Sequence, residues 1–191
     1  MIYLASASPR RQELLRQLGL DFEVIPSNLE EVLQPGERPQ DYVARVARDK
    51  AHHVARQLRE QGKPLRPVLG ADTEVVLDGG VLGKPRDREH GIEMLRKLSG
   101  RTHDVLSGVC VLHDGREHAA LNVSRVTFRP LTEAELAAYW DTGEPADKAG
   151  AYAIQGRAAA FIERLEGSYS GVMGLPLYEL TGILRAIREI A

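Results

Sequence analysis

Apolar residues in the first third of the chain recur in patterns typical of one strand and two helices. Ile2 to Ala5 is a short apolar run that predicts a buried strand. Ser8-Pro9 has the pattern of an N-cap followed by proline at the first helical position, which predicts a helix that runs through Leu18 and ends at Gly19. A second helix is predicted from about residue 39 to about residue 58, because apolar residues return there at every third or fourth position.

The rest of the chain alternates between strand and helix patterns. Short apolar or β-rich runs predict strands at 68–71, 75–77, 81–82, 105–112, 120–128 and 159–165. Helical spacing and capping signals predict helices at 87–98, 132–140 and 177–187. Turn signals at Asp78-Gly79-Gly80 and Asp114-Gly115 predict two hairpins. The fold class is therefore α/β, with a mixed β-sheet flanked by helices.

Length and composition indicate one ordinary globular domain. The chain has 191 residues and shows no internal repeat or linker, so we expect a single domain over 1–191. The 25 Lys and Arg residues against 27 Asp and Glu residues give a net charge of −2, which argues against a nucleic-acid partner. Cys110 alone excludes an internal disulfide, and cytoplasmic location is the expectation. No run approaches the roughly 18 apolar residues of a bilayer span, and no signal peptide is expected.

The first predicted helix carries a cationic pattern that favours an anion. Arg10 and Arg11 fall in its first turn, where positive charge opposes the helix dipole. The hydroxyls of Ser6 and Ser8, the free helix amides and the guanidiniums together match the oxygens of a polyphosphate. The alternative interpretation is a Ser-Pro cap followed by two solvated arginines.

Two lysines stand in unusual positions. Lys50 is four residues after Val46 and four before Val54, in the middle of an apolar helical stripe. Lys84 lies in a Gly-Lys-Pro turn, which does not match a P-loop. Both side chains could reach a shared cleft. The alternatives are a snorkelling side chain for Lys50 and an ordinary exposed turn for Lys84.

Two acidic residues, Asp72 and Glu31, are candidates for binding a metal or activating water. Asp72 follows the apolar run 68–71, so we expect it at or near the end of a strand, where a carboxylate can bind a metal or activate water. A turn that Asp72 and Thr73 merely close is the alternative. Glu31, in an acidic loop, is a second and weaker candidate metal ligand. Gln155 lies in the Gly-rich loop 141–156, and its amide can both donate and accept, as the edge of uracil or thymine requires.

Five segments of the chain, taken in order, resemble the Maf family of nucleoside triphosphate pyrophosphatases. They are Ser6-Ala7-Ser8-Pro9-Arg10-Arg11, Gly70-Ala71-Asp72-Thr73, Gly83-Lys84-Pro85, Asp147-Lys148-Ala149-Gly150-Ala151-Tyr152, and Gly167-Ser168-Tyr169 with Gly174-Leu175-Pro176-Leu177. Their order and spacing cover nearly the whole chain. The final loop resembles the dTTP/UTP branch of the family rather than the 7-methyl-GTP branch.

The resemblance implies a fold and an activity. The fold has two lobes around a central cleft and is similar to that of inosine triphosphate pyrophosphatases. The reaction cleaves a nucleoside triphosphate between its α and β phosphates, with a divalent metal, Mg²⁺ or Mn²⁺, and gives a nucleoside monophosphate and pyrophosphate. The family also implies a homodimer, while the net charge and the short apolar runs described above argue against a nucleic-acid or membrane partner.

The resemblance also assigns roles. Asp72 corresponds to the proton acceptor; Arg10, Thr73 and Gln155 fall at positions associated with substrate selection; and Ser8, Arg11, Glu31, Lys50 and Lys84 match polar residues of the cleft. We therefore predict three groups: catalytic Asp72, Lys84 and Lys50; substrate-binding Ser8, Arg10, Arg11, Thr73 and Gln155; and metal-binding Asp72 and Glu31.

The chain departs from the family pattern at two places. Glu74 stands where relatives commonly carry an apolar residue, and it either adds a carboxylate near the metal or points outward. Arg157-Ala158-Ala159-Ala160 replaces a segment that is often glycine-rich. Two rival functions stay open: the same chemistry on purine or modified nucleotides, and a non-catalytic nucleotide-binding regulator, suggested by the family's association with septum formation.

Overall fold

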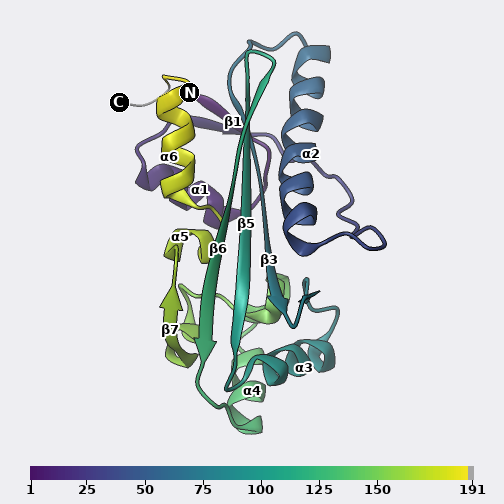
Figure 1. Ribbon diagram of the computed structural model, residues 1–191, viewed down its shortest axis with the longest axis vertical. Helices are drawn as coiled ribbons and strands as arrows, with labels where there is room; N and C mark the ends of the chain where they lie inside the picture. The colour runs from purple at the N-terminus through teal and green to yellow at the C-terminus, as the bar shows by residue number, and fades with distance from the viewer. Residues whose placement is uncertain (189–191) are drawn as a thin grey trace.

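Three long strands run through the molecule and carry the other elements at their two ends (Figure 1). In the computed structural model, which describes residues 1–188, these strands are β3 (Val68–Leu77), β5 (Thr102–His113) and β6 (Arg116–Phe128). The shorter strands are β1 (Ile2–Leu4), β2 (Phe22–Val24), β4 (Gly80–Val81) and β7 (Ile162–Glu166). The helices are α1 (Pro9–Gln17), α2 (Pro39–Glu60), α3 (Arg88–Leu98), α4 (Glu133–Trp140), α5 (Tyr169–Met173) and α6 (Leu177–Ala186).

The strands form one mixed sheet in the order β2-β1-β3-β5-β6-β7, with β4 paired to β3. β1 is parallel to both β2 and β3, whereas the remaining pairs are antiparallel. The two predicted hairpins are present, β3 with β4 and β5 with β6. This arrangement confirms the α/β fold class with a mixed sheet flanked by helices.

The strand predicted over 68–71 ends later than expected, so its predicted end is wrong. β3 does not stop at Asp72 but continues to Leu77, and Asp72 pairs with Gly108 in the middle of the strand. The strand continues because β5 offers it unbroken antiparallel partners from Val68 to Val76. β1 is much shorter, and its pairing with β3 ends at Leu69. The strand edge beyond that point is left open beside Asp72, and this opening makes room for a cleft.

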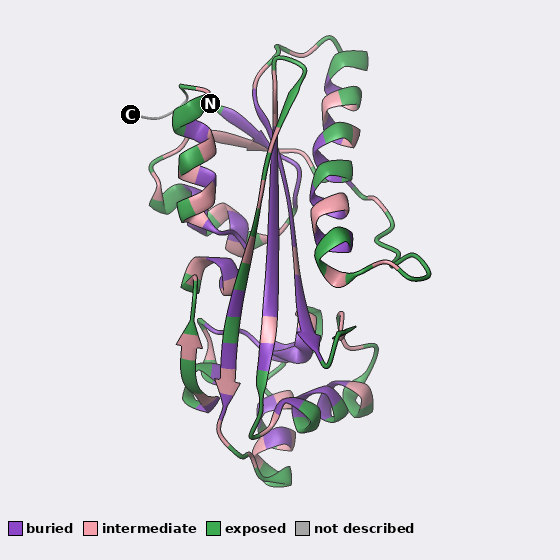
Figure 2. Cartoon of the chain, in the orientation of Figure 1, coloured by how far each residue is buried: buried purple, intermediate pink, exposed green. Residues whose placement is uncertain are grey.

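α2 packs closely against β3 and β5 on one face of the sheet. Its apolar stripe is buried as predicted, and Lys50 is buried within it. Figure 2 shows buried residues along the middle of the strands and on the side of α2 that faces them. The approach is close because β3 has glycine at position 70: a Cβ there would lie 2.1 Å from the carbonyl oxygen of Ala47. This backbone contact fixes the position of α2, and with it Lys50, along β3.

The elements gather at the two ends of the long strands. α1, α2 and α6 lie with β1 at one end, and α3, α4 and β7 lie at the other (Figure 1). The segment 141–161 adopts three short 3₁₀ turns, Glu144–Asp147, Ala149–Ala151 and Arg157–Phe161. The last of these delays the start of β7 to Ile162, later than predicted. No helix among residues 1–188 is long and apolar enough to cross a membrane.

Two short elements escape the sequence prediction. β2 has three residues with a glutamate at its centre, too few to establish an alternating pattern. α5 has five residues between Gly167 and Gly174, and glycine-rich surroundings suggest a loop. α5 nevertheless matters for the site, because the carbonyl oxygen of Gly174, the residue that follows it, accepts a hydrogen bond from Arg11.

Candidate active site

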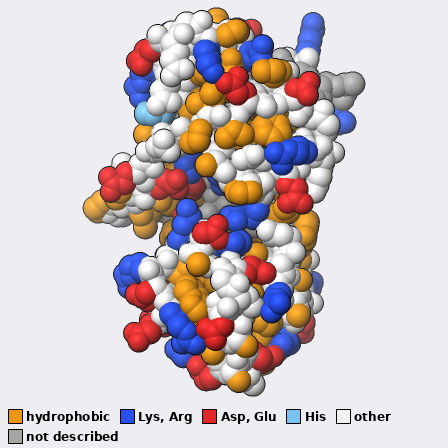
Figure 3. Space-filling view, turned by 180° about the vertical axis from the view of Figure 1, so that it is seen from behind, with side chains coloured by type: hydrophobic (Ala, Val, Ile, Leu, Met, Phe, Trp, Pro, Cys, Tyr) orange, Lys and Arg blue, Asp and Glu red, His pale blue; other side chains and the backbone are white. Residues whose placement is uncertain are grey.

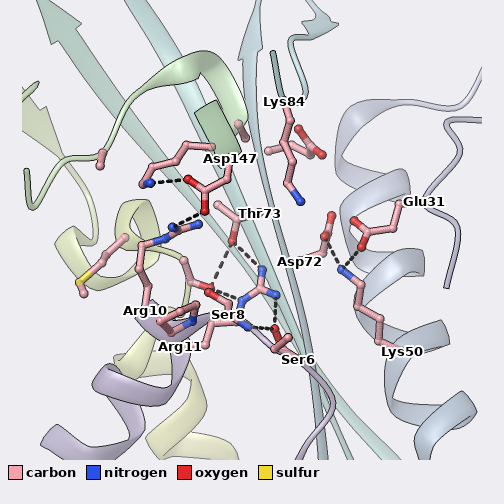
Figure 4. Close-up of a pocket in the computed structure, with 18 of the residues that line it drawn as sticks. Ser6, Ser8, Arg10, Arg11, Glu31, Lys50, Asp72, Thr73, Lys84 and Asp147 are labelled. Atoms are coloured by element: carbon pink, nitrogen blue, oxygen red, sulfur yellow. Dashed lines mark hydrogen bonds and ion pairs between the residues drawn. The ribbon is translucent and has the colours of Figure 1, made fainter. Parts of the chain in front are cut away.

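A cavity of about 470 Å³ lies between the two groups of elements, beside the middle of β3. Its lining comes from the start of α1, the loop before α2, the middle of β3, the turn after β4 and the 147–155 segment. All the residues predicted from the sequence line it: Ser8, Arg10, Arg11, Glu31, Lys50, Asp72, Thr73, Lys84 and Gln155. Figure 4 shows most of them around a common space. The predicted convergence of these distant side chains is therefore present in the fold, although their roles remain predictions.

Lys50 joins two carboxylates at the wall of the cavity (Figure 4). Its ammonium Nζ lies 2.9 Å from Oδ1 of Asp72 and 2.7 Å from Oε1 of Glu31. The Lys50 side chain is only 7% exposed, because the apolar stripe of α2 surrounds it. The lysine therefore acts as a buried positive charge that holds one oxygen of Asp72 in place. A snorkelling side chain, the alternative from sequence, does not describe this position.

The other carboxylate oxygen of Asp72 is buried without a partner among the described residues. The residue is 3% exposed, and Oδ2 has no hydrogen-bond partner within residues 1–188. Burial raises the pKa of Asp72 above its ordinary value, although the positive charges of Lys50 and Arg11 act in the opposite direction. Burial also acts to raise the pKa of Glu31, but the charge and hydrogen bond of Lys50 outweigh it and lower that pKa. The two carboxyls thus differ in how readily they take up a proton.

Glu74 is buried in the same wall and does not point outward. It follows Asp72 by two positions on β3, so both side chains lie on the same face of the strand. Burial raises the pKa of Glu74 to about 8, and the negative charges of Asp72 and Glu31 add to the rise. Its Oε2 also lacks a hydrogen-bond partner in the described part of the chain. Of the two alternatives left by the sequence, the structure selects a carboxylate in the cavity.

Arg11 is held by the protein itself. Its Nε donates to the carbonyl oxygen of Gly174 at 2.9 Å, and its Nη1 donates to the hydroxyl of Ser6 at 3.1 Å. The hydroxyl of Thr73 lies 3.5 Å from Nη2 of Arg11 and 2.9 Å from the hydroxyl of Ser107. The guanidinium is buried, and burial lowers the pKa of Arg11. Arg11 therefore ties α1 to β3 and to the end of α5, and brings a fixed positive charge close to Asp72.

The start of α1 keeps free groups for a ligand. Ser8 is the N-cap residue, yet its side chain makes no capping hydrogen bond, and Pro9 follows it. The first amides of a helix have no partner inside the helix. Arg10 reaches across the cavity to Asp147, with 3.8 Å between Nη1 and Oδ2 (Figure 4). This end of the helix thus offers a hydroxyl, amides and a guanidinium, as an anionic ligand requires.

Lys84 and Gln155 form the exposed rim on the other side. The turn that carries Lys84 is fixed to the 149–151 segment, because the amide of Gly150 donates to the carbonyl oxygen of Gly83 at 2.8 Å. Gln155 lies in a turn held by Glu144, whose carboxylate accepts from the hydroxyl of Tyr139 at 2.6 Å and from the amide of Arg157 at 3.0 Å. The amide side chain of Gln155 therefore stands on a fixed backbone at the edge of the cavity.

Ser107 is the supporting residue that the sequence did not reveal. It lies on β5 directly opposite Thr73, is fully buried, and donates to the carbonyl oxygen of Gly171 at 2.6 Å. The one available signal is a serine within the apolar run 105–112. Such a serine needs a partner, but only the register of β3 and β5 identifies which one.

The carboxylates fit a divalent cation that is shared with a phosphate ligand. Among residues 1–188, no three His, Cys, Asp or Glu side chains are arranged to hold a metal ion by themselves. The unpartnered oxygens of Asp72 and Glu74 are nevertheless hard donors, the kind that Mg²⁺ and Mn²⁺ prefer. Mg²⁺ is usually held by one or two carboxylates together with substrate phosphates. The residues present match this second case.

Ionisable groups of both signs gather around the cavity. Arg10, Arg11, Lys50, Lys84 and Lys148 supply positive charge, and Glu31, Asp72 and Asp147 supply negative charge, which Glu74 adds to only above about pH 8. Figure 3 shows blue and red side chains together at the hollow between the two ends of the molecule. An anionic ligand would meet local cations here although the chain as a whole is slightly acidic.

Comparison with known proteins identifies close relatives over the whole chain. The family model described as Maf-like protein matches residues 1–187. A protein of Alkalilimnicola ehrlichii named dTTP/UTP pyrophosphatase is 58% identical, with 96% of this chain and 91% of the relative covered. Proteins with the same name from Methylococcus capsulatus and Cupriavidus pinatubonensis are 54% and 52% identical, with 96% and 98% of this chain and 89% and 96% of the relatives covered. The solved Ham1 protein of Staphylococcus aureus has a TM-score of 0.46 and 17% identity, with 66% of this chain and 71% of that chain covered.

Proposed function

The chain belongs to the Maf family, and from this premise we propose that it hydrolyses dTTP and UTP to the nucleoside monophosphate and pyrophosphate. Relatives at 52–58% identity that bear the name dTTP/UTP pyrophosphatase support the substrate. The observation that carries the proposal is the shared cavity, in which a buried acid at Lys50 faces the cationic start of α1.

The triphosphate lies across the cavity between the two ends of the molecule. The first amides of α1, the Ser8 hydroxyl and the Arg10 guanidinium bind phosphate oxygens, and Lys84 approaches them from the opposite rim. These groups neutralise the charge that develops as the phosphoanhydride breaks. Gln155 faces the base and pairs with the O4 and N3-H edge of thymine or uracil.

Asp72 accepts the proton of the attacking water. Lys50 anchors Oδ1, and Oδ2 is left as the acceptor. The water oxygen forms a bond to the α-phosphorus, the bond from that phosphorus to the bridging oxygen breaks, and the electron pair leaves with pyrophosphate. The raised pKa of Asp72 makes the carboxylate a better proton acceptor than an exposed aspartate.

A divalent cation belongs to the proposal as a cofactor, Mg²⁺ or Mn²⁺. Asp72 and Glu31 would hold it as predicted from the sequence, and Glu74 offers a further oxygen in the same wall. Such an ion supplies charge neutralisation on the phosphates. Every other step above rests on side chains and amides of the chain itself.

A panel of nucleoside triphosphates tests the proposal. dTTP, UTP, CTP, dATP and dGTP are incubated with Mg²⁺ or Mn²⁺, and monophosphate, diphosphate, pyrophosphate and orthophosphate are separated. We expect dTMP or UMP with pyrophosphate, and little product from the purines. Diphosphate with orthophosphate would place cleavage at the wrong bond. Preference for purine or modified nucleotides would favour the first rival function, and binding without pyrophosphate release would favour the regulatory one.

The variant Asp72→Asn tests the role of Asp72 as proton acceptor independently of its contribution to folding. The variant keeps the size of the side chain but removes its basicity, so we expect loss of turnover with the thermal transition largely preserved. Near-normal activity would refute the role of Asp72. The homodimer expected from the resemblance belongs to the same proposal, and sedimentation equilibrium measures it directly.

A further inference from the structure

We propose that Arg45 is a positioning residue: it fastens the segment 28–37 to α2 and thereby holds the Glu31 carboxylate at the ammonium of Lys50. This inference rests on the proposed function only where it concerns turnover. Its structural part stands on the contacts of the segment itself. Arg45 lies outside every motif that the sequence analysis used.

The segment 28–37 has little else to hold it. It contains no helix or strand, and the apolar side chains of Val32 and Leu33 face solvent, 54% and 43% exposed, while Leu29 is half-buried at the cavity. Within the described residues, its hydrogen bonds and ion pairs to the rest of the chain occur at two places. One is the Glu31 carboxylate at Lys50, and the other is the guanidinium of Arg45.

Arg45 grips the segment at two points. Its Nε and Nη2 donate to the two carboxylate oxygens of Glu37 at 2.6 and 2.8 Å, the bidentate geometry that gives a strong charge-assisted pair. Nη2 also donates to the carbonyl oxygen of Val32 at 3.0 Å, one residue beyond Glu31. Glu37 in turn accepts from the amide of Gln34 at 3.1 Å, which closes the turn between the two points.

The position of Arg45 on α2 links this grip to the active site. Arg45 precedes Lys50 by five residues on the same helix, and that helix is fixed against β3 at Gly70. The segment is thus fastened to the same rigid element that carries Lys50. When a triphosphate enters and competes with Glu31 for Lys50, the Arg45 contacts are what keep the Glu31 carboxylate at the cavity. We expect Arg45 to set the position of Glu31 without touching the substrate.

A double-mutant cycle tests this coupling. The variants are Glu37→Gln, Arg45→Gln, Glu31→Gln and the pair Glu31→Gln with Glu37→Gln, each assayed for kcat and KM with dTTP. We expect Glu37→Gln to lower kcat by about tenfold, the loss of one charge-assisted pair. In the Glu31→Gln background the same change should lower kcat by less than about twofold, because nothing remains to be positioned. Equal fold-losses in both backgrounds would overturn the proposal.

Hydrogen exchange supplies a readout that does not need activity. In Glu37→Gln and Arg45→Gln, the amide of Gln34, which donates to the Glu37 carboxylate at 3.1 Å, should exchange about tenfold faster, while those of β3 and β5 keep their protection. Unchanged exchange at Gln34 in both variants would also overturn the proposal, whatever the enzyme hydrolyses. If the substrate panel shows no pyrophosphate release but exchange rises as expected, the proposed function fails and the fastening by Arg45 stands.

Glu133→Gln is the matched control. Glu133 on α4 forms a bidentate pair with Arg96 on α3, with both contacts at 2.7 Å. Neither residue lines the cavity. The substitution removes the same kind of bidentate pair, from a more exposed position: the Glu133 side chain is 66% exposed and that of Glu37 12%. We expect no change in kcat and no change in exchange at Gln34, and a tenfold loss in this control would mean that any lost surface pair has the same effect.

Discussion

Replacing Gly70 by alanine would push α2 away from β3, because the two backbones touch at this residue. The added Cβ would lie 2.1 Å from the carbonyl oxygen of Ala47 and 2.7 Å from the amide nitrogen of Ala51. The first distance is 1.3 Å short of the 3.4 Å at which ordinary contact begins. Neither neighbour is the end of a flexible side chain, so the helix itself must move.

The size of the effect follows from this displacement. Overpacking in a core costs about 1 to 3 kcal/mol, and contact with backbone places Gly70→Ala near the upper end. For a chain of this length, about 3 kcal/mol lowers the melting temperature by about 6 to 12 °C. A shift of about 1 Å would also stretch the 2.9 Å pair between Lys50 and Asp72 beyond hydrogen-bond distance. Misplacement on this scale lowers kcat by about a hundredfold.

Thermal unfolding and steady-state kinetics measure the two consequences together. Gly182→Ala is the control, because this helical glycine in α6 has nothing within 4 Å of the added Cβ. Alanine there should raise stability by about 0.5 to 1 kcal/mol and leave kcat unchanged. If Gly70→Ala melts at the wild-type temperature and turns over normally, the close contact between α2 and β3 does not position Lys50.

Four further substitutions test other parts of the structure. Burial lowers the pKa of His103 to about 4, so between pH 6.5 and 4 the unfolded chain binds a proton that the folded chain does not bind. Over that interval the free energy of unfolding of wild type, measured with urea, should therefore fall by up to about 3 kcal/mol more than that of His103→Gln. Burial raises the pKa of Glu74 to about 8, so stability falls as pH rises from about 4.5 to 8, and Glu74→Gln should melt higher than wild type at pH 8 in EDTA; an equal or lower melting temperature would contradict this. Gln155→Ala should abolish the preference for dTTP and UTP, and Glu144→Gln should weaken it by loosening the turn under Gln155, as the same nucleotide panel would show. An unchanged ranking of the five nucleotides in both variants would mean that the base is selected elsewhere.

The sequence predicts the site well where a residue contradicts its local pattern. Lys50 in an apolar stripe and Arg10 at the positive end of a helix are unfavourable in isolation, and both line the cavity. The strand, helix and hairpin signals also predict most of the sheet. These features depend on spacing along the chain, which the sequence contains directly.

What depends on pairing between distant segments could not be predicted. Asp72 lies in mid-strand rather than at a strand end, because β5 continues beside it. The buried position of Glu74 depends on the distant segments that close the cavity around β3, and the role of Ser107 depends on the register that places it opposite Thr73. Arg45 looks like an ordinary helix-surface arginine until the loop before α2 folds back onto it.

Hydrolysis in water enriched in oxygen-18 tests the central claim most directly, since that claim is attack of a water held by Asp72 on the α-phosphorus. With dTTP as substrate, mass spectrometry of the products should find one heavy oxygen in the phosphate of dTMP and none in pyrophosphate, and Asp72→Asn should form neither product at a comparable rate. Heavy oxygen in pyrophosphate or orthophosphate would show attack at another phosphorus and contradict the account.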